Sequence, residues 1–242
     1  MPDERASPAD ESVTLSMIRA AGRRIEGGII LSPCPESLAL SEITGVKIFC
    51  KLDNLQRTGS FKERGARNAL LQLSPRAKAR GVVAPSAGNH ALGLAYHGRL
   101  LKVPVTVVMP EYAPLIKRTT CERLGAKVVV QGKDFAEARA AADEVVARDG
   151  ATYVHGFDDA QIIAGQGTAG LEILRQVPDL DAIVCPIGGA GLIAGIAVAV
   201  KALRPKVEII GIESVATASF SAALKAGHPV AIPRRSTLAD GL

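Results

Sequence analysis

The stretch TGSFKERGARNALLQL, residues 58–73, places a lysine at the start of a predicted helix, where the helix dipole disfavours a cation. Ser60 and Glu63 have the S-x-x-E spacing in which the serine hydroxyl caps the helix and the glutamate bonds back to the serine amide. Apolar side chains then recur at the spacing of one helix face, at Ala66, Ala69, Leu70 and Leu73. The pattern predicts a helix with Ser60 as its N-cap.

Lys62 lies four residues before Ala66 and therefore on the apolar face of this helix. It also lies in the first turn, where burial and the positive end of the helix dipole both disfavour a cation. We expect a lowered pKa and a neutral amine, which is a nucleophile. The alternative is a lysine whose aliphatic stem only covers apolar surface, and other segments must decide between the two.

Composition predicts a globular chain without a nucleic-acid, membrane or metal partner. A length of 242 residues with 48% hydrophobic content suffices for a sizeable core. The net charge of +5 is spread over mixed-sign residues and only 3% of residues are aromatic, which argues against a nucleic-acid surface. The cysteines stand far apart without metal-ligand spacing, at Cys34, Cys50, Cys121 and Cys185. The longest apolar run, residues 192–200, is too short to span a bilayer, and the polar start MPDERASPADES is unlike a signal peptide. We expect a cytoplasmic protein.

Strands and helices alternate along the chain, which predicts an α/β fold with parallel sheets covered by helices on both faces. No linker interrupts the alternation, so a second domain would be inserted in the first. We predict a small domain of residues 58–156 inserted in a large domain of residues 1–57 and 157–242. The predicted strands are residues 46–52, 81–86, 104–110, 127–132, 152–157, 181–189 and 207–214. The predicted helices are residues 13–26, 60–73, 89–101, 113–125, 134–150, 165–177 and 192–205.

Two loops follow predicted strands and open helices, which is where parallel sheets bind ligands. The first, in PSAGNHALG, predicts a nest of backbone amides for an anion, at Ser86, Ala87, Gly88, Asn89 and His90. The second, in PIGGAGLIAG, has glycines that permit close approach of a phosphate, at Gly188, Gly189, Ala190, Gly191 and Leu192. A tight turn without a ligand is the alternative for each loop.

The second loop also permits a different class of enzyme. Gly189, Gly191 and Ala194 fit G-x-G-x-x-A, and Glu213 ends the next strand, where a dinucleotide-binding unit has its ribose-binding acid. This spacing predicts an NAD-dependent enzyme, which needs Glu213 and can spare Lys62. An enzyme that uses pyridoxal phosphate needs an amine, a phosphate cradle, a polar partner for the ring and a carboxylate site. Lys62 and the two loops supply all four.

Five segments resemble one family: KLDNLQRTGSFKERGARNAL, SAGNHALGLAY, VMPEYAPLIKRTTCERLGAKVV, FDDAQIIAGQGTAGLEIL and PIGGAGLIAGIA. The family is that of threonine dehydratase (threonine ammonia-lyase) and serine dehydratase, among the tryptophan-synthase-β-like (fold type II) pyridoxal-phosphate enzymes. The likeness runs from about residue 31 to residue 242. It implies a two-domain, three-layer α/β sandwich with parallel-rich sheets, in which the large domain binds pyridoxal 5′-phosphate.

The resemblance also implies roles for single residues. Lys62 matches the family's Schiff-base lysine, Phe61 lies beside it in the cofactor site, and Asn89 matches the asparagine that contacts the ring hydroxyl. Residues 188–192 match the phosphate loop, and residues 86–90 match the loop that grips the substrate carboxylate. The implied reaction is β-elimination and deamination of L-threonine, and also of L-serine, to a 2-oxo acid and ammonia. The family further implies a homo-oligomer and a role in isoleucine biosynthesis.

Three departures from the family pattern qualify these expectations. Serine racemases have a serine where this chain has Ala87, which favours elimination, with a serine racemase or serine-specific dehydratase as the alternative. The phosphate loop usually has a glycine where this chain has Ala190, so a positive φ there would lower phosphate affinity. Some relatives bind a cation through an acid six residues after Glu213, where this chain has Ser219, so we expect no metal.

The segment STLADGL matches the middle of the family pattern, and relatives continue beyond it with the last strands of the large domain. We therefore expect those strands, and the hydroxyl that faces the pyridine nitrogen, to be missing from this chain.

Overall fold

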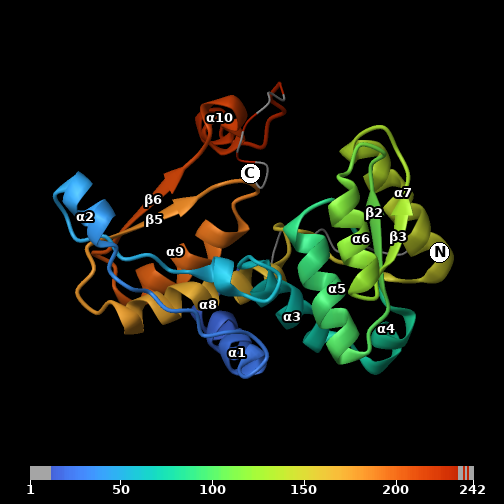
Figure 1. Cartoon of the computed structure of the whole chain (residues 1–242), viewed down its shortest axis with the longest axis horizontal. Helices are drawn as coiled ribbons and strands as arrows, with labels where there is room; N and C mark the ends of the chain where they lie inside the picture. The colour runs from blue at the N-terminus through green and yellow to red at the C-terminus, as the bar shows by residue number, and fades with distance from the viewer. Residues whose placement is uncertain (1–11, 234–236, 238, 240–242) are drawn as a thin grey trace.

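The computed structural model describes residues 12–233, 237 and 239, and these form two lobes (Figure 1). One lobe contains a four-stranded sheet in the order β3-β2-β1-β4, and the other a two-stranded sheet in the order β5-β6. All strand pairs within both sheets are parallel. The predicted α/β class with parallel sheets is confirmed. The assignment of residues 58–156 to an inserted domain stays a prediction.

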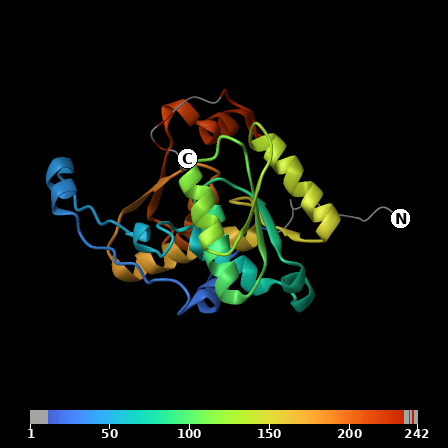
Figure 2. The same ribbon diagram turned by 45° about the vertical axis from the view of Figure 1, so that its right-hand side comes forward.

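The four-stranded sheet is the middle layer of its lobe. Its central strand β1 is buried along its whole length. Alternate side chains face two different helix layers, because successive residues of a strand point to opposite sides. Val82 and Ala84 pack toward α5 and α6, whereas Val83 packs toward α7. Helices lie on both sides of this sheet (Figure 2). The elements of this lobe are α4 Pro75–Arg80, β1 Val82–Pro85, α5 Asn89–Leu101, β2 Val105–Met109, α6 Leu115–Arg123, β3 Lys127–Val130, α7 Phe135–Asp149 and β4 Thr152–Tyr153.

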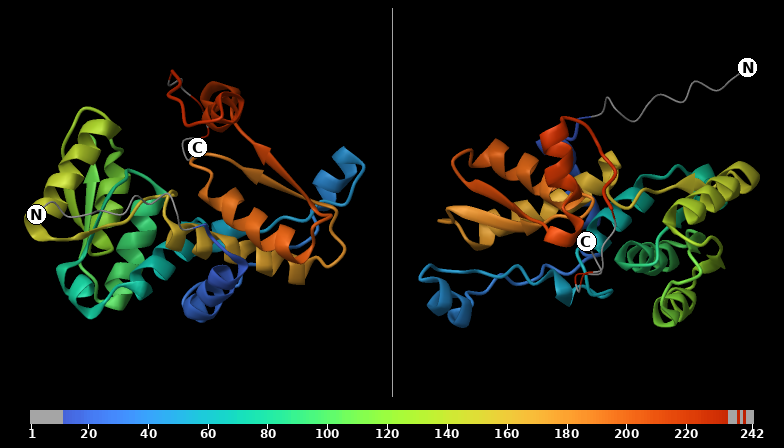
Figure 3. Two further views of the ribbon diagram at one scale, coloured as in Figure 1. Left: turned by 180° about the vertical axis from the view of Figure 1, so that it is seen from behind. Right: turned by 90° about the horizontal axis from the view of Figure 1, so that it is seen from above.

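The other lobe stacks a sheet, a pair of helices and a further helix (Figures 1 and 3). The inner face of β5 and β6 packs on α8 and α9, with Ile183 and Cys185 buried there. Helix α1 lies on the far side of α8, with Ile18 and Ala21 buried against Ala164. The elements of this lobe are α1 Leu15–Ile25, α2 Leu38–Thr44, η2 Asp53–Leu55, α8 Ala160–Gln176, β5 Ala182–Pro186, α9 Gly191–Leu203, β6 Glu208–Ile212, η3 Val215–Thr217 and α10 Ser219–Ala226.

Helix α3, Lys62–Gln72, lies between the lobes and packs on α5 of one lobe and α8 of the other. At its crossing with α8, a Cβ on Gly165 would stand 2.6 Å from the Cα of Gly65, so a side chain there has no room. At its crossing with α5, a Cβ on Gly93 would stand 3.4 Å from the Cβ of Ala66. Small residues therefore let α3 approach both neighbours closely, and the first residue of this helix is Lys62.

Helix α3 begins one residue later than the sequence predicts. Its N-cap is Phe61 rather than Ser60, and no side chain caps it. The Glu63 carboxylate accepts the amide of Thr58 instead of the amide of Ser60. The reason is the turn at Gly59, whose φ of +80° brings Thr58 back toward the helix. The predicted capping box is therefore wrong, although the prediction that a helix carries Lys62 near its start is confirmed.

Other boundaries also differ. The segment predicted as a strand over residues 46–52 forms only an isolated antiparallel bridge, between Glu36 and Phe49. Helix α8 begins five residues before its predicted start, because the Asp159 side chain accepts the amides of Gln161 and Ile162. In the described part of the chain, no helix is both long and apolar enough to cross a membrane.

Candidate active site

The side chain of Lys62 reaches from the start of α3 to the segment that follows β4. Its Nζ donates a hydrogen bond of 2.6 Å to the carbonyl oxygen of Gly156, which lies 94 residues further along the chain. The Nζ also lies 5.4 Å from the centroid of the Phe61 ring. Burial lowers the pKa of the amine to about 8, since desolvation disfavours the charged form. At pH 7 about 10% of such amines are neutral, against about 0.03% for an ordinary lysine.

Residues 86–90 form the loop between β1 and α5, and they leave backbone amides unpaired. The α5 N-cap is Gly88, which has no side chain to cap the helix. In the described part of the chain the amide of Gly88 bonds to Ser86 Oγ at 3.3 Å, whereas the amides of Ala87, Asn89 and His90 have no protein acceptor. By contrast, α1, α4, α7 and α8 each begin with a capping side chain. The unpaired donors make this loop suited to an anion.

His90 is the last residue of this loop and lies in the first turn of α5. Its side chain is buried, its Nε2 lies 3.1 Å from the carbonyl oxygen of Val154, and its Nδ1 has no partner among the described residues. Burial, together with the nearby Lys62 cation, lowers its pKa to about 3, so the ring is neutral. Because Nε2 must donate to the carbonyl, Nδ1 is an acceptor without a donor. A buried polar atom without a partner indicates a place for a ligand or water.

Residues 188–192 connect β5 to α9 and form the second set of unpaired amides. The amides of Gly188, Gly189 and Ala190 have no protein acceptor within the described ranges, and no side chain caps α9. Ala190 is the N-cap and has a φ of +63°, which is the left-handed conformation that disfavours residues other than glycine. Ala190 therefore has the positive φ that we expect to lower the affinity of this loop for phosphate.

The segment of residues 154–157 joins these parts, and the sequence interpretation missed it. The carbonyl of Val154 contacts His90, and the carbonyl of Gly156 accepts from Lys62. Phe157 lies against Gly189 and Gly191. These residues were predicted to continue a strand, but β4 ends at Tyr153, so they form a loop at the carboxyl end of that strand. Ligands of parallel sheets bind at the loops that follow the strands. A predicted strand that ended at Tyr153 would therefore have indicated this loop as well.

Behind Lys62, the chain buries two ionic groups. The side chains of Glu63 and His97 are 0% exposed and form a 3.1 Å contact between Oε2 and Nε2. Arg64 is also fully buried. Its guanidinium donates two bonds to Asp53, at 2.7 and 2.8 Å, and two to Glu172, at 2.7 and 2.8 Å. Both groups hold the turn and helix that present Lys62.

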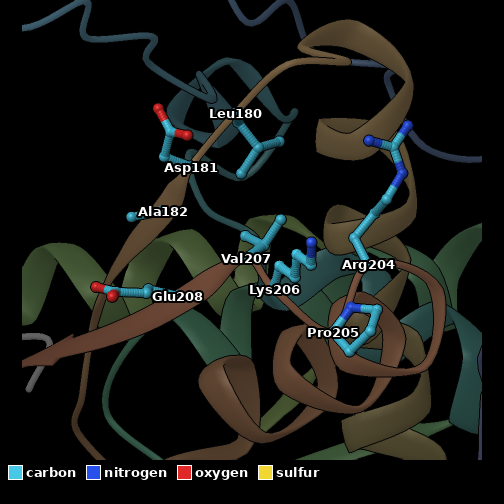
Figure 4. A pocket seen from close by; sticks show the side chains of 8 residues that line it. All are labelled: Leu180, Asp181, Ala182, Arg204, Pro205, Lys206, Val207 and Glu208. Carbon is cyan, nitrogen blue, oxygen red and sulfur yellow. The ribbon is translucent and has the colours of Figure 1, made fainter.

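A cavity of about 630 Å³ lies elsewhere, at the amino ends of β5 and β6 (Figure 4). Its walls include the exposed charges of Asp181, Lys206 and Glu208 (Figure 4). It lies at the opposite end of β5 from residues 188–192, so it is not the candidate site. The lining residues are Leu180, Asp181, Ala182, Arg204, Pro205, Lys206, Val207 and Glu208.

The combination of a low-pKa lysine with two sets of unpaired amides also matches a known family. Residues 25–242 match the family model described as "Pyridoxal-phosphate dependent enzyme". The chain belongs to the pyridoxal-phosphate dependent enzyme family. The residues present fit this cofactor, because the amine of Lys62 contacts Gly156 and the loop with unpaired amides contacts the neighbouring Phe157. Lys62 would hold its aldehyde carbon and residues 188–192 its phosphate.

Membership of the pyridoxal-phosphate dependent enzyme family rejects the interpretation as an NAD-dependent enzyme. The structure gives Glu213 another role. Its carboxylate accepts the amides of Phe220 and Ser221, both at 2.8 Å, and thereby caps α10. Among the described residues no group of histidine, cysteine and acidic side chains is arranged to hold a metal ion. The expectation of no metal stays a prediction.

Relatives in this family share the fold and include threonine ammonia-lyases and a serine racemase. An L-threonine ammonia-lyase of Thermotoga maritima is 45% identical over 95% of this chain and 57% of its own length. The processed form of threonine deaminase isoform 2 from Solanum lycopersicum has a TM-score of 0.88 and 38% identity, over 100% of this chain and 69% of its own. Maize serine racemase has a TM-score of 0.93 and 33% identity, over 96% and 70%. The chain thus spans little more than half the length of the Thermotoga relative.

Proposed function

We propose that this protein is a pyridoxal-phosphate-dependent lyase that removes the β-hydroxyl and the amino group from L-threonine, and also from L-serine. The products are a 2-oxo acid and ammonia. The observation that carries the proposal is the amine of Lys62, which has its pKa lowered to about 8 and bonds to the segment of residues 154–157 that contacts both loops of unpaired amides. The similarity to threonine ammonia-lyases supports the choice of substrate.

The proposed roles follow from the chemistry of each group. The amides of residues 188–192 bind the cofactor phosphate, Asn89 bonds the ring hydroxyl, and Phe61 packs beside the ring. The amides of residues 86–90 bind the substrate carboxylate, because the α5 N-terminus favours an anion. When bound, the cofactor withdraws the electron pair that is left at Cα. Lys62, released by the substrate, takes the Cα proton as a general base, for which the lowered pKa suits it.

Ala87 supports elimination rather than racemisation. A racemase must deliver a proton to the face of Cα opposite the lysine, and the methyl group of Ala87 can neither donate nor accept one. A serine racemase or serine-specific dehydratase remains the alternative, since maize serine racemase has a similar structure. The ratio of D-serine to pyruvate formed from L-serine tests this point, and comparable amounts of the two products would contradict it.

The first experiment uses the purified chain with added pyridoxal phosphate. We expect visible absorbance from the cofactor bound through an amine, and borohydride reduction followed by peptide mapping should place the label on Lys62. Turnover of threonine and serine is then followed through 2-oxobutanoate and pyruvate. The variant Lys62→Ala should lose the label and the turnover, whereas the control Lys78→Ala, on α4, should keep both. A label on another lysine would overturn the assignment.

We also propose that residues 1–57 and 157–242 form the cofactor-binding domain and that residues 58–156 form the inserted domain. This division is supported by the sheets, because the strands of one sheet lie within residues 82–153 and those of the other within residues 182–212. We further propose a cytoplasmic homo-oligomer that acts in isoleucine biosynthesis, without nucleic-acid or membrane partners. Light scattering of the purified protein tests the oligomer.

A further inference from the structure

Gly156 and Phe157 are neighbours in sequence, and each contacts a different half of the candidate cofactor site. The Gly156 carbonyl accepts the hydrogen bond from Lys62 at 2.6 Å. The Phe157 side chain packs on residues 188–192 of the phosphate loop. The amine and the phosphate loop come from segments more than 120 residues apart, since Lys62 and Gly188 are 126 positions from one another. Two consecutive residues therefore connect them.

Phe157 explains why two positions of the loop are glycine. A Cβ on Gly189 would overlap the Phe157 ring, at its Cγ, Cδ1 and Cδ2 atoms. A Cβ on Gly191 would stand 2.6 Å from the carbonyl oxygen of Phe157. Real Cβ atoms do not approach other atoms so closely. These glycines thus make room for Phe157, in addition to any approach that they permit to a phosphate.

The Phe157 ring also contacts the ring of His155. The ring of His155 packs edge-on against it with centroids 4.5 Å apart. His155 is fixed in turn, because its Nδ1 accepts the amides of Phe157 at 3.3 Å and Asp158 at 2.8 Å. Phe157 is 39% exposed, so its ring lies partly at the surface while it contacts Gly189 and His155.

We propose that Phe157 is a positioning residue that holds the phosphate loop at a fixed separation from Lys62. This inference rests on the proposed function. The aldehyde and the phosphate of pyridoxal phosphate are attached to one rigid ring. The two protein groups that bind them must therefore stay at a fixed distance from each other. The ring of Phe157 fixes one end of that distance through Gly189, and the backbone of Phe157 contacts Gly191. The backbone of Gly156 fixes the other end through Lys62.

The test compares pyridoxal phosphate with pyridoxal, which lacks the phosphate. Phe157→Ala should raise the Kd of pyridoxal phosphate at least tenfold and change the Kd of pyridoxal less than twofold, measured by the visible absorbance of the amine-bound aldehyde. Phe157→Leu should restore part of the preference, because leucine still fills the space over Gly189. Phe135→Ala, which removes a ring of similar exposure (37%) from α7, should leave both constants unchanged. An equal loss for both aldehydes, or no loss, overturns the proposal.

A double-mutant cycle tests the contact without any cofactor. Gly189→Ala should lower Tm by about 5 °C or more in the wild-type background. The same substitution should have little effect in the Phe157→Ala background, because the added methyl group then occupies vacated space. Equal effects in both backgrounds overturn the contact. A wild-type chain that binds neither aldehyde at Lys62 contradicts the proposed function, and the cycle then still supports or overturns the role of Phe157 in holding this loop.

Discussion

The Nε2 of His97 lies 3.1 Å from the Oε2 of Glu63, and neither side chain is exposed to solvent. Glu63 directly follows Lys62, and its other oxygen accepts the amide of Thr58. Burial raises the pKa of Glu63, but the hydrogen bonds from His97 and Thr58 outweigh it and hold the pKa below its ordinary value. The pKa of His97 is lowered, mainly by burial, so a neutral imidazole donates to a carboxylate. The pair fixes the turn that leads into Lys62.

This pair should make the protein sensitive to acid. His97 stays neutral in the folded state, whereas the unfolded state binds a proton below pH 6.5, so stability is lost as pH falls from about 6.5 toward the lowered pKa. The loss is at most about 1.4 kcal/mol per pH unit for one histidine. Urea unfolding at pH 7.5, 6 and 5 should therefore show a shallower dependence for His97→Gln than for the wild type. His228→Gln, at an exposed position, serves as the control and should not change the slope.

The lowered pKa of Lys62 predicts selective chemical modification. The neutral fraction of its amine rises through pH 8, so its rate of reaction with an amine reagent should have a midpoint near pH 8. Ordinary lysines should reach their midpoint about two pH units higher. Competitive labelling followed by peptide mapping measures all lysines in one sample, and the others serve as internal controls. A midpoint for Lys62 that coincides with theirs would contradict the role of burial.

Ala190→Gly should stabilise the protein, since a left-handed φ of +63° costs an alanine about 1 kcal/mol more than a glycine. The same substitution at Ala140, an exposed helical residue of α7, should destabilise by about 1 kcal/mol. Urea unfolding of both variants at neutral pH provides the comparison. We also expect Ala190→Gly to lower the Kd of pyridoxal phosphate, because the loop no longer opposes its bound conformation. Two variants with the same sign of change would show that strain at Ala190 is not the cause.

Arg64 should be among the most sensitive positions in the chain. Its substitution by methionine leaves the carboxylates of Asp53 and Glu172 without their main cation in a buried place. Loss of one partner from such a group costs about 3–5 kcal/mol. The exposed pair of Arg148 and Asp149 offers a matched control, and Arg148→Met should give no measurable change in urea unfolding. Retention of wild-type stability by Arg64→Met would mean that the buried network contributes little.

Local signals predicted some elements well. Helix α5 covers the predicted residues 89–101, because it starts after Gly88 and ends at Lys102 in the left-handed conformation. Helix α7 is bounded by the capping side chain of Asp134 and by Gly150, both of which are visible in the sequence. These boundaries depend on neighbours within one or two turns, so the sequence pattern contains them. The lowered pKa of Lys62 was also predicted, although its helix begins one residue later than expected and the burial that lowers the pKa involves distant segments such as Gly156.

Features that depend on distant partners could not be predicted. The segment of residues 46–52 looks like a strand, and its amides at Cys50 and Leu52 do bond to the carbonyls of Pro35 and Pro33. The two prolines have no N–H to return, so a regular ladder cannot form. The role of Phe157 leaves no helical or strand periodicity in the sequence, because its contact with Gly189 joins two loops. The residue assignments at the site follow the family pattern and remain proposals.

The close crossings of α3 leave little room for change in its sequence. This helix is in contact with α5 through Gly93 and Ala66, and with α8 through Gly65 and Gly165. A methyl group on Gly165 would stand 2.6 Å from the Cα of Gly65, so alanine at this position would push α8 and α3 apart. The first residue of α3 is Lys62, so a single methyl group at this crossing would displace the amine together with its helix.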